Sequence, residues 1–518
     1  MKKLMLTTVI LGGLLGFQFT ASAQYKDKKD VQEQPKTETE VLLEKAESAQ
    51  EPVVITLEQA LEIALSENVA VKVADLEIQR TKYAKKGAYA ALYPQIDLSA
   101  SYQRTIKRQV MYMDVDSKSM ASMMGGSSSA DLATIMQTLQ ALHPEAFPST
   151  PSAPETEVEQ TQSSSASAGG IEVGRLNTLN GGVTVAMPLI NAQLWQGLKI
   201  SGMDVELAVE KARASRLDMV SQVKSAFFGT LFAKEAQNVY QEVYNNAVSN
   251  FEETKRKFDA QKVSELELLR AKTNVASSIT NLYNAESTVV LALWQLKAVL
   301  GVDLDMNLDV AGKLEDWSQQ MFYDVHQHDS INVDNNSAIK QLAIQTEQLA
   351  QNIKLQKYAN IPSLALAFNF SMNTMANDVS FSEFKWTPYS YVALSLNIPI
   401  FAGGKRHFAI RQAQNQYNQV KLQVDNTERQ LKIAIRQQLN TMETNMKSYY
   451  AAQETTAMAQ KAYDIAEASY KVGRSTQLEL NDAQLALTQA QLAQHQAVYN
   501  FLNAKTQLEQ TLGQDFIQ

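Results

Sequence analysis

Few residues in this chain have the types and the spacing that metal chemistry requires. His326-Gln327-His328 offers two imidazoles to a metal ion, but no third ligand of suitable spacing lies nearby. Five methionines could offer soft sulfur ligands to copper(I), but their serine-rich surroundings are typical of a polar loop. They are Met111, Met113, Met120, Met123 and Met124. We therefore predict no metal site.

Catalytic and cofactor-binding patterns are equally incomplete. Asp303, Asp305 and Asp309 lack the central glycine and terminal glutamate of a calcium loop. Gly403-Gly404-Lys405 lacks the earlier glycine and the Ser/Thr of a phosphate-binding loop. The chain contains no cysteine, and its five histidines do not form a Ser/His/Asp set. The sequence therefore predicts no enzyme and no cofactor.

The first residues have the pattern of a secretory signal peptide over 1–23. Lys2 and Lys3 precede a short apolar run, and Ala21-Ser22-Ala23 gives a small-residue cleavage site before Gln24. The alternative is a membrane anchor, for which the run is short. Removal of the two lysines takes the formal charge from −8 to −10 (−8 minus 2), so nucleic acid is not an expected partner.

Later segments do not reach the roughly 20 apolar residues of a membrane-spanning helix. A secreted chain of this kind is either soluble outside the cytoplasm or crosses a membrane as a β-barrel. Residues 24–55 are expected to form a polar N-terminal extension.

The chain is internally duplicated. Residues 258–272 align without a gap with residues 470–484, and each segment is followed at the same distance by a Leu-Gly pair. These pairs are Leu300-Gly301 and Leu512-Gly513. We expect a first repeat over 56–301, a linker or equatorial segment over 302–337, a second repeat over 338–513 and a short tail over 514–518.

Four segments alternate apolar and polar or small residues with period two, which predicts strands. The strands are expected at about 95–104, 176–187, 363–372 and 390–398. A Ser- and Met-rich stretch, 105–175, separates the first two and is expected to be an extracellular loop. In a membrane barrel the apolar side would meet lipid and the other side would meet water. A soluble sandwich strand has the same alternation.

Prolines flank these strands. Proline disfavours helix in the preceding residue and cannot donate to a strand ladder. Pro94 and Pro362 are therefore expected to stop a helix and start a strand. Pro188 and Pro399 are expected to end a strand before the next helix.

Two very long helices are predicted over 191–262 and 403–473, because neither stretch contains proline. In the last helix, Leu478 and Leu485 begin a seven-residue stripe, and a second stripe of alanines runs beside it. Two stripes on one helix favour a closed ring of helices. Four strands cannot close a barrel, so three copies are needed for a twelve-stranded one.

In this arrangement the chain resembles the TolC-type outer-membrane efflux proteins over nearly its whole secreted length. The resemblance rests on motif order and duplication rather than on any single motif. The motifs are Thr56 to Leu65, Tyr93-Pro94-Gln95-Ile96, Ile398 to Gly404, and Tyr470-Lys471-Val472-Gly473 through Leu478-Glu479-Leu480. Thr56 and Gln59 also form a plausible capping box.

The resemblance implies a mainly α-helical homotrimer with a transmembrane β-barrel in the outer membrane and helices in the periplasm. A periplasmic adaptor and an inner-membrane pump would be its partners, with outer-membrane lipid around the barrel. Constriction residues would be Glu267, Glu479, Asp482 and Tyr470, with Arg474 beside Ser475, where the family has its arginine. The acids are equally compatible with an ordinary solvated helix face.

Two other classes stay open. A secreted coiled-coil scaffold or adhesin would need the helices but not four proline-flanked alternating strands. A periplasmic enzyme would need a polar constellation that the residues do not supply.

Overall fold

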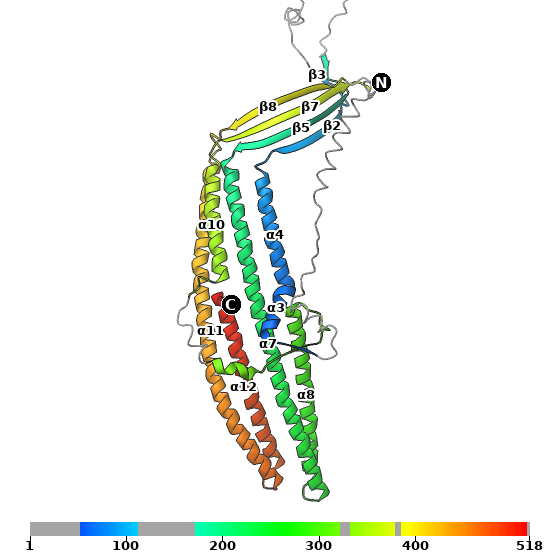
Figure 1. Ribbon diagram of the computed structural model, residues 1–518, viewed down its shortest axis with the longest axis vertical. Helices are drawn as coiled ribbons and strands as arrows, with labels where there is room; N and C mark the ends of the chain where they lie inside the picture. The colour runs from blue at the N-terminus through cyan, green and yellow to red at the C-terminus, as the bar shows by residue number, and fades with distance from the viewer. Residues whose placement is uncertain (1–51, 112–170, 322–331, 379–384, 515–518) are drawn as a thin grey trace, which may run out of the picture. The chain divides into compact units, whose positions relative to one another are not determined.

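The computed structural model describes residues 52–111, 171–321, 332–378 and 385–514 (Figure 1). The chain divides into two compact units. A helical unit comprises Met1–Ala88, Gln193–Ala359 and Phe401–Gln518, and a sheet unit comprises Tyr89–Ala192 and Asn360–Ile400. The predicted signal peptide, the His326-Gln327-His328 pair, the centre of the Ser/Met-rich loop and residues 515–518 lie outside the described residues.

The α-helices of the described chain are α3 (Leu57–Glu67), α4 (Val69–Ala90), α7 (Ala192–Asp259), α8 (Glu265–Leu300), α10 (Ser337–Tyr358), α11 (Lys405–Lys471) and α12 (Gln477–Leu512). Three helices follow the same order in each repeat, α4, α7 and α8 in the first and α10, α11 and α12 in the second, and α3 precedes the first set. Helix α7 has 68 residues, which corresponds to about 100 Å. In the helical unit α7 runs beside α8, and α11 runs beside α12 (Figure 1). Among the described residues, no helix combines the length and hydropathy that a membrane crossing requires.

The core of the helical unit includes segments that the sequence indicated as polar or connecting. Strand β1 (Val53–Ile55) pairs in parallel with β6 (Leu308–Val310), and η1 (Leu314–Gln320) follows. Ile55 and Leu314 are fully buried against α7, α8 and α12. Burying one such side chain contributes about 1.5–3 kcal/mol. Val53–Ile55 and residues 308–320, which lie within the expected extension and the expected linker or equatorial segment, are thus part of the core.

Helix starts and ends follow capping chemistry. The predicted capping box at the start of α3 is confirmed, since the side chains of Thr56 and Gln59 each accept a backbone N–H of the other residue. Gly301 and Gly513 end α8 and α12 in the left-handed region, with φ of 79° and 67°. The duplicated Leu-Gly pairs are thus two equivalent helix ends.

The sheet unit contains one four-stranded antiparallel sheet in the order β2-β5-β7-β8. Its strands are β2 (Gln95–Arg104), β5 (Asn177–Ile190), β7 (Ser363–Ala376) and β8 (Thr387–Asn397). A small ladder, β3 (Gln109–Met111) with β4 (Ile171–Val173), extends the first pair into the segment expected to be a loop. β2 and β8 are edge strands within the described part of the chain.

The strand register places the apolar residues of all four strands on one face. Leu98 faces Val183, Val183 faces Phe370, and Leu366 faces Leu394. The opposite face carries small and polar residues, and there Asn369 Nδ2 donates to Thr184 Oγ1 at 3.0 Å. The apolar face is largely exposed in the single chain, as at Leu98, Val392 and Leu394.

Pro188 corrects one expectation. It lies inside β5 rather than at its end, and the register shifts between Pro188 and Ile190. Because this irregularity absorbs one residue, Ile190 pairs with Leu364 and stays on the apolar face. Pro94 and Pro362 directly precede β2 and β7, and Pro399 follows β8.

Candidate functional site at the ends of the helix hairpins

The two helix hairpins turn in the same way. The first turn runs from Asp259 to Glu265 and the second from Lys471 to Gln477. Each contains one residue in the left-handed region, Gln261 (φ 56°) in the first and Gly473 (φ 78°) in the second. Gln261 is the only non-glycine residue with positive φ in the described part of the chain. The duplication seen in the sequence therefore extends to backbone conformation.

The acids expected at the constriction occupy the first turns of the returning helices. Glu479 and Thr476 form a capping box at the start of α12, and Glu267 donates its backbone N–H to the Ser264 side chain at the start of α8. Glu479 Oε2 accepts from Ser475 Oγ at 2.5 Å and from the Thr476 N–H at 3.0 Å. These bonds, that from Ser475 first, lower the pKa of the Glu479 carboxyl. Glu479 is thus an ionised side chain tied to its own helix.

Tyr470 is the centre of a buried polar contact between three helices. Its hydroxyl donates to Gln477 Oε1 at 2.8 Å and lies 2.6 Å from Thr254 Oγ1. These residues come from the end of α11, the start of α12 and the last turns of α7. Tyr470 is 3% exposed and Gln477 is 1% exposed. We call Tyr470, Thr254 and Gln477 the tip node.

Lys257 covers the tip node from α7. Its Nζ lies 4.5 Å from the centre of the Tyr470 ring and donates to the Tyr470 carbonyl at 2.8 Å. Lys257 also pairs with Glu253 at 3.1 Å. Lys257 therefore connects α7 to the end of α11 by two interactions, and the ion pair with Glu253 holds it to its own helix.

Tyr470 and Tyr463 of α11 stay protonated near neutral pH. Burial raises the pKa of Tyr470. Burial also raises the pKa of Tyr463, which lies two helical turns earlier on α11, to about 12. The tip node therefore consists of neutral hydrogen-bonding groups.

Arg474 and Asp482, also expected at the constriction, lie apart from the tip node. Both side chains are exposed, and within the described residues no hydrogen bond or ion pair joins either of them to Tyr470. Of the five residues expected at the constriction, only Tyr470 enters the node. Thr254, Gln477 and Lys257 were missed, because their approach depends on how two hairpins pack.

A groove between α8 and α12 opens near the same tips. Leu266, Leu269 and Leu478 line it and are each more than half exposed. Asn274 Nδ2 donates to Asn481 Oδ1 at 3.1 Å across the two helices. The groove therefore combines exposed leucines with paired amides at the end of the helical unit.

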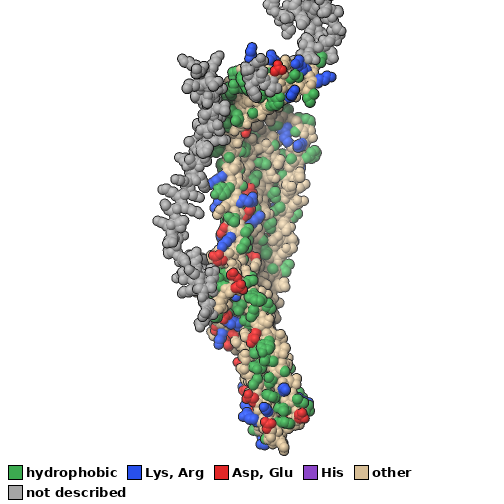
Figure 2. All heavy atoms as spheres, turned by 90° about the vertical axis from the view of Figure 1, so that its right-hand side faces the viewer, with side chains coloured by type: hydrophobic (Ala, Val, Ile, Leu, Met, Phe, Trp, Pro, Cys, Tyr) green, Lys and Arg blue, Asp and Glu red, His purple; other side chains and the backbone are tan. Residues whose placement is uncertain are grey.

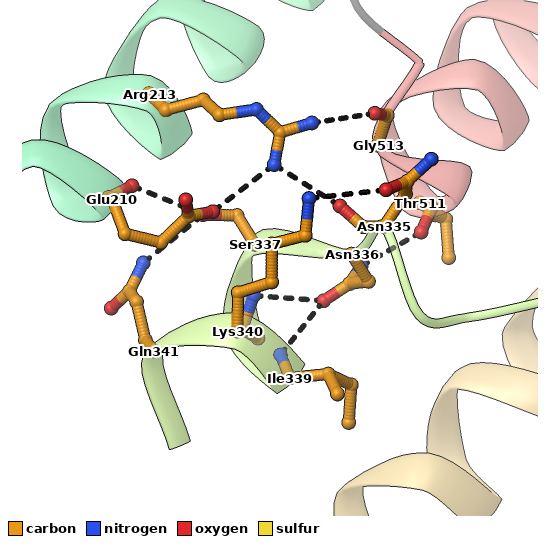
Figure 3. Close-up of polar contacts among 11 residues, drawn as sticks. Glu210, Arg213, Asn335, Asn336, Ser337, Ile339, Lys340, Gln341, Thr511 and Gly513 are labelled. Atoms are coloured by element: carbon orange, nitrogen blue, oxygen red, sulfur yellow. Dashed lines mark hydrogen bonds and ion pairs between the residues drawn. The ribbon is translucent and has the colours of Figure 1, made fainter. Parts of the chain in front are cut away.

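The other end of the second hairpin is held by a separate network (Figure 3). Arg213 of α7 donates to the Gly513 carbonyl at 2.8 Å and to the Asn335 carbonyl at 3.1 Å, and pairs with Glu210. Asn336 Nδ2 donates to the Thr511 carbonyl at 2.7 Å. The end of α12 is therefore tied to α7 and to the start of α10.

The aspartates near β6 have structural roles. Lys234 of α7 contacts both carboxylate oxygens of Asp309 at 2.8 Å, and Asp303 Oδ1 accepts the Asp305 N–H at 3.0 Å. Gly403 and Gly404 form the tight turn before α11, with φ of 56° and 80°. The three aspartates therefore serve an ion pair and a turn, and the two glycines serve the turn before α11.

The chain is mainly helical, with one four-stranded antiparallel sheet and two long helix hairpins in a duplicated order, which is the arrangement expected from the sequence motifs. The chain belongs to the outer membrane efflux protein family, whose sequence pattern matches residues 155–302 and 332–514. The family consists of channel proteins of the outer membrane, and this chain is accordingly an outer-membrane protein.

Solved structures share the fold at low sequence identity. They include the CmeC outer membrane channel of Campylobacter jejuni (17% identity, TM-score 0.61, 88% of this chain and 85% of that chain). VceC of Vibrio cholerae is 14% identical (TM-score 0.61, 88% and 96%), and the open state of MtrE of Neisseria gonorrhoeae is 16% identical (TM-score 0.61, 88% and 88%). No curated protein matches the chain.

Proposed function

We propose that the protein is the outer-membrane exit channel of a tripartite efflux or type I secretion system. Three copies close a twelve-stranded barrel in the membrane, and their helices form a tube in the periplasm. An inner-membrane pump and a periplasmic adaptor deliver the cargo, which the channel conducts passively. The channel itself carries out no catalysis.

The sheet carries this proposal. Its apolar face is continuous across four strands, exposed on the two edge strands and partly exposed on the two central ones. Its other face is lined mainly by hydroxyls, amides and small side chains. An open sheet edge is not stable in lipid, because its N–H and C=O groups would lack partners. Joining β8 of one copy to β2 of the next satisfies both edges and places the polar face around a water-filled lumen.

Exposed apolar stripes on the helices favour the same assembly. Along α4, Val69, Val73, Leu76 and Tyr83 recur at spacings of four, three and seven and are each more than half exposed. In α12, Ala490, Ala497 and Ala504 of the alanine stripe are buried, whereas Ala486 and Ala493 are exposed. Leu478 and Leu485 of the other stripe are exposed as well. A second copy is the partner that these stripes fit, since one chain leaves them uncovered.

The tip node suits a latch that holds the periplasmic end closed. It joins α7 of the first hairpin to α11 and α12 of the second through groups that are shielded from water. In this proposal Glu267, Glu479, Asp482 and Arg474 form charged rings around the opening when three copies meet. Such rings of carboxylates favour cations. The groove between α8 and α12 is the proposed seat of the adaptor.

Closure of the sheet is tested by cross-linking, for which the absence of cysteine is convenient. Ser99 and Ala393 lie on the polar face of the two edge strands. Ser99→Cys combined with Ala393→Cys, Tyr391→Cys or Ser395→Cys should give oxidised species that end at three chains. Each single variant is the control and should give no ladder ending at three chains. Monomers from every pair would contradict the proposal.

Pore formation is tested in planar bilayers. The wild-type protein should give a small closed conductance. Tyr470→Phe and Thr254→Val should raise it severalfold, because each removes a buried hydrogen bond worth about 0.5–1.5 kcal/mol. Tyr450→Phe is the matched control, since Tyr450 is half exposed on the same helix. A scaffold or adhesin would give no conductance with any variant.

A further inference from the structure

Basic residues gather at one end of the sheet unit. Arg104 is the last residue of β2, Lys107 and Arg175 lie in the adjoining turns, and Lys385 precedes β8. All four side chains are exposed. Figure 2 shows Lys and Arg side chains collected around this end of the sheet unit. Asp378 is an acidic residue with a described side chain at the same end.

These charges have few counter-ions in the described part of the chain. Arg175 donates to the Met375 carbonyl at 3.2 Å, which leaves its charge without an acidic partner there. The side chains of Arg104, Lys107 and Lys385 make no hydrogen bond or ion pair with any described residue. Aromatic and apolar side chains lie beside them, namely Tyr102, Trp386 and Ile106, the last of which is 99% exposed. This mixture is typical of a membrane–water interface.

The direction of the strands indicates whether this end of the sheet faces the outside of the cell or the periplasm. The opposite strand ends lead into α4, α7, α10 and α11 within a few residues. If the helices lie in the periplasm, as the proposed function requires, the Arg104 end faces outward. Arg104 follows Ile96, Leu98 and Tyr102 on the apolar face. From Ile96 to Arg104 a strand tilted by about 40° rises roughly 20 Å, close to the apolar band of about 25 Å in a membrane barrel.

We propose that this basic cluster binds phosphate-bearing headgroups of outer-leaflet lipids. The proposal rests on the proposed channel. Closure joins β8 of one copy to β2 of the next, so Lys385 of one copy would lie at the same seam as Arg104 and Lys107 of its neighbour. Each seam then presents cations at headgroup depth, with Tyr102 and Trp386 anchoring the same level.

Lipid binding by the purified assembly tests the proposal. Native mass spectrometry would count molecules of diphosphoryl lipid A bound per assembly, against the same lipid with both phosphates removed. The wild-type protein should bind the phosphorylated lipid at least tenfold more tightly. The triple variant Arg104→Gln, Lys107→Gln, Lys385→Gln should lose that preference. A control triple variant with the same charge change, Lys199→Gln, Lys421→Gln, Lys461→Gln on exposed helix positions, should retain it.

Three outcomes would overturn the assignment. They are equal affinity for both lipids, an unchanged preference in the first triple variant, and full competition by millimolar inorganic phosphate. Bilayer conductance of the first triple variant should match that of the wild type. A wild-type protein that fails to conduct would count against the channel, whereas a conducting protein without lipid preference would count against this cluster alone.

Discussion

Asn68 and Asn336 occupy equivalent positions in the two repeats and make the same contacts. Asn68 Nδ2 donates to the Val299 carbonyl at 2.7 Å, and Asn336 Nδ2 donates to the Thr511 carbonyl, also at 2.7 Å. The Oδ1 of each accepts the backbone N–H two residues later, at the start of α4 or α10. Asn68 thus caps the start of α4 and holds the end of α8, and Asn336 caps the start of α10 and holds the end of α12.

Replacing either asparagine should destabilise the helical unit. Asn68→Ala and Asn336→Ala each remove an N-cap worth about 1 kcal/mol and leave a carbonyl unpaired, at a further cost of about 1–3 kcal/mol. Urea unfolding in detergent, followed by circular dichroism, measures the loss. Asn68→Asp keeps the cap but not the amide donor, so an intermediate loss is expected. Asn284→Ala, at an exposed position in α8, is the control and should have little effect.

The glycine that follows each returning helix should be irreplaceable for a steric reason. A Cβ on Gly513 would lie 2.3 Å from the Asn335 carbonyl oxygen, and one on Gly301 would lie 3.0 Å from the Asn68 Cα. Gly513→Ala should therefore reduce the free energy of unfolding more than Gly301→Ala. A similar loss from both variants would indicate that only the left-handed backbone matters.

Gln261 should be a site where glycine improves the protein. Its φ of 56° costs a non-glycine residue roughly 1 kcal/mol, and the equivalent residue of the second hairpin is Gly473. Gln261→Gly should slow amide hydrogen exchange in the first tip, and Gly473→Gln should speed it in the second. Faster exchange in Gln261→Gly would show that the glutamine side chain stabilises the turn.

Several features of the fold followed from residue patterns alone. Alternation identified the strands because a pleated backbone turns successive side chains to opposite faces. The strand register did not follow, so the irregularity at Pro188 was unexpected. The tip node was also beyond the sequence, since Thr254 and Tyr470 lie 216 positions apart and meet only through hairpin packing.

Other features were readable but missed. Thr476 and Glu479 have the same Thr-x-x-Glu/Gln pattern that identified the start of α3, yet Glu479 was interpreted as a constriction acid or a solvated side chain and not as a helix cap. The repeated Leu-Gly pairs marked two equivalent helix ends. Asn68 before α4 and Asn336 before α10 were also recognisable as N-cap residues.

Acidification should destabilise the helical unit through His495. Burial lowers the pKa of His495, and Glu235 and Glu315 oppose this shift only in part. The unfolded chain therefore takes up a proton at a pH where the folded chain does not. Stability should fall as the pH drops through about 6.5, the ordinary histidine pKa, and should level off below the folded value. His495→Gln should flatten this dependence in urea unfolding, whereas His407→Gln, at an exposed position, should not.

Glu479 offers a way to separate a helix cap from a pore charge. Glutamine also satisfies the third position of a capping box, so Glu479→Gln should keep the start of α12 while removing the charge. Glu479→Ala should lower the stability of the helical unit, because the Ser475 hydroxyl and the Thr476 N–H lose their acceptor. If Glu479 also faces the proposed conduction path, both variants should reduce cation preference equally, measured as the reversal potential in a salt gradient. Asp482→Asn is the comparison, since its exposed carboxylate has no described partner and only the charge effect applies. A reversal potential unchanged in Glu479→Gln, with stability lost in Glu479→Ala, would assign Glu479 to the helix cap alone.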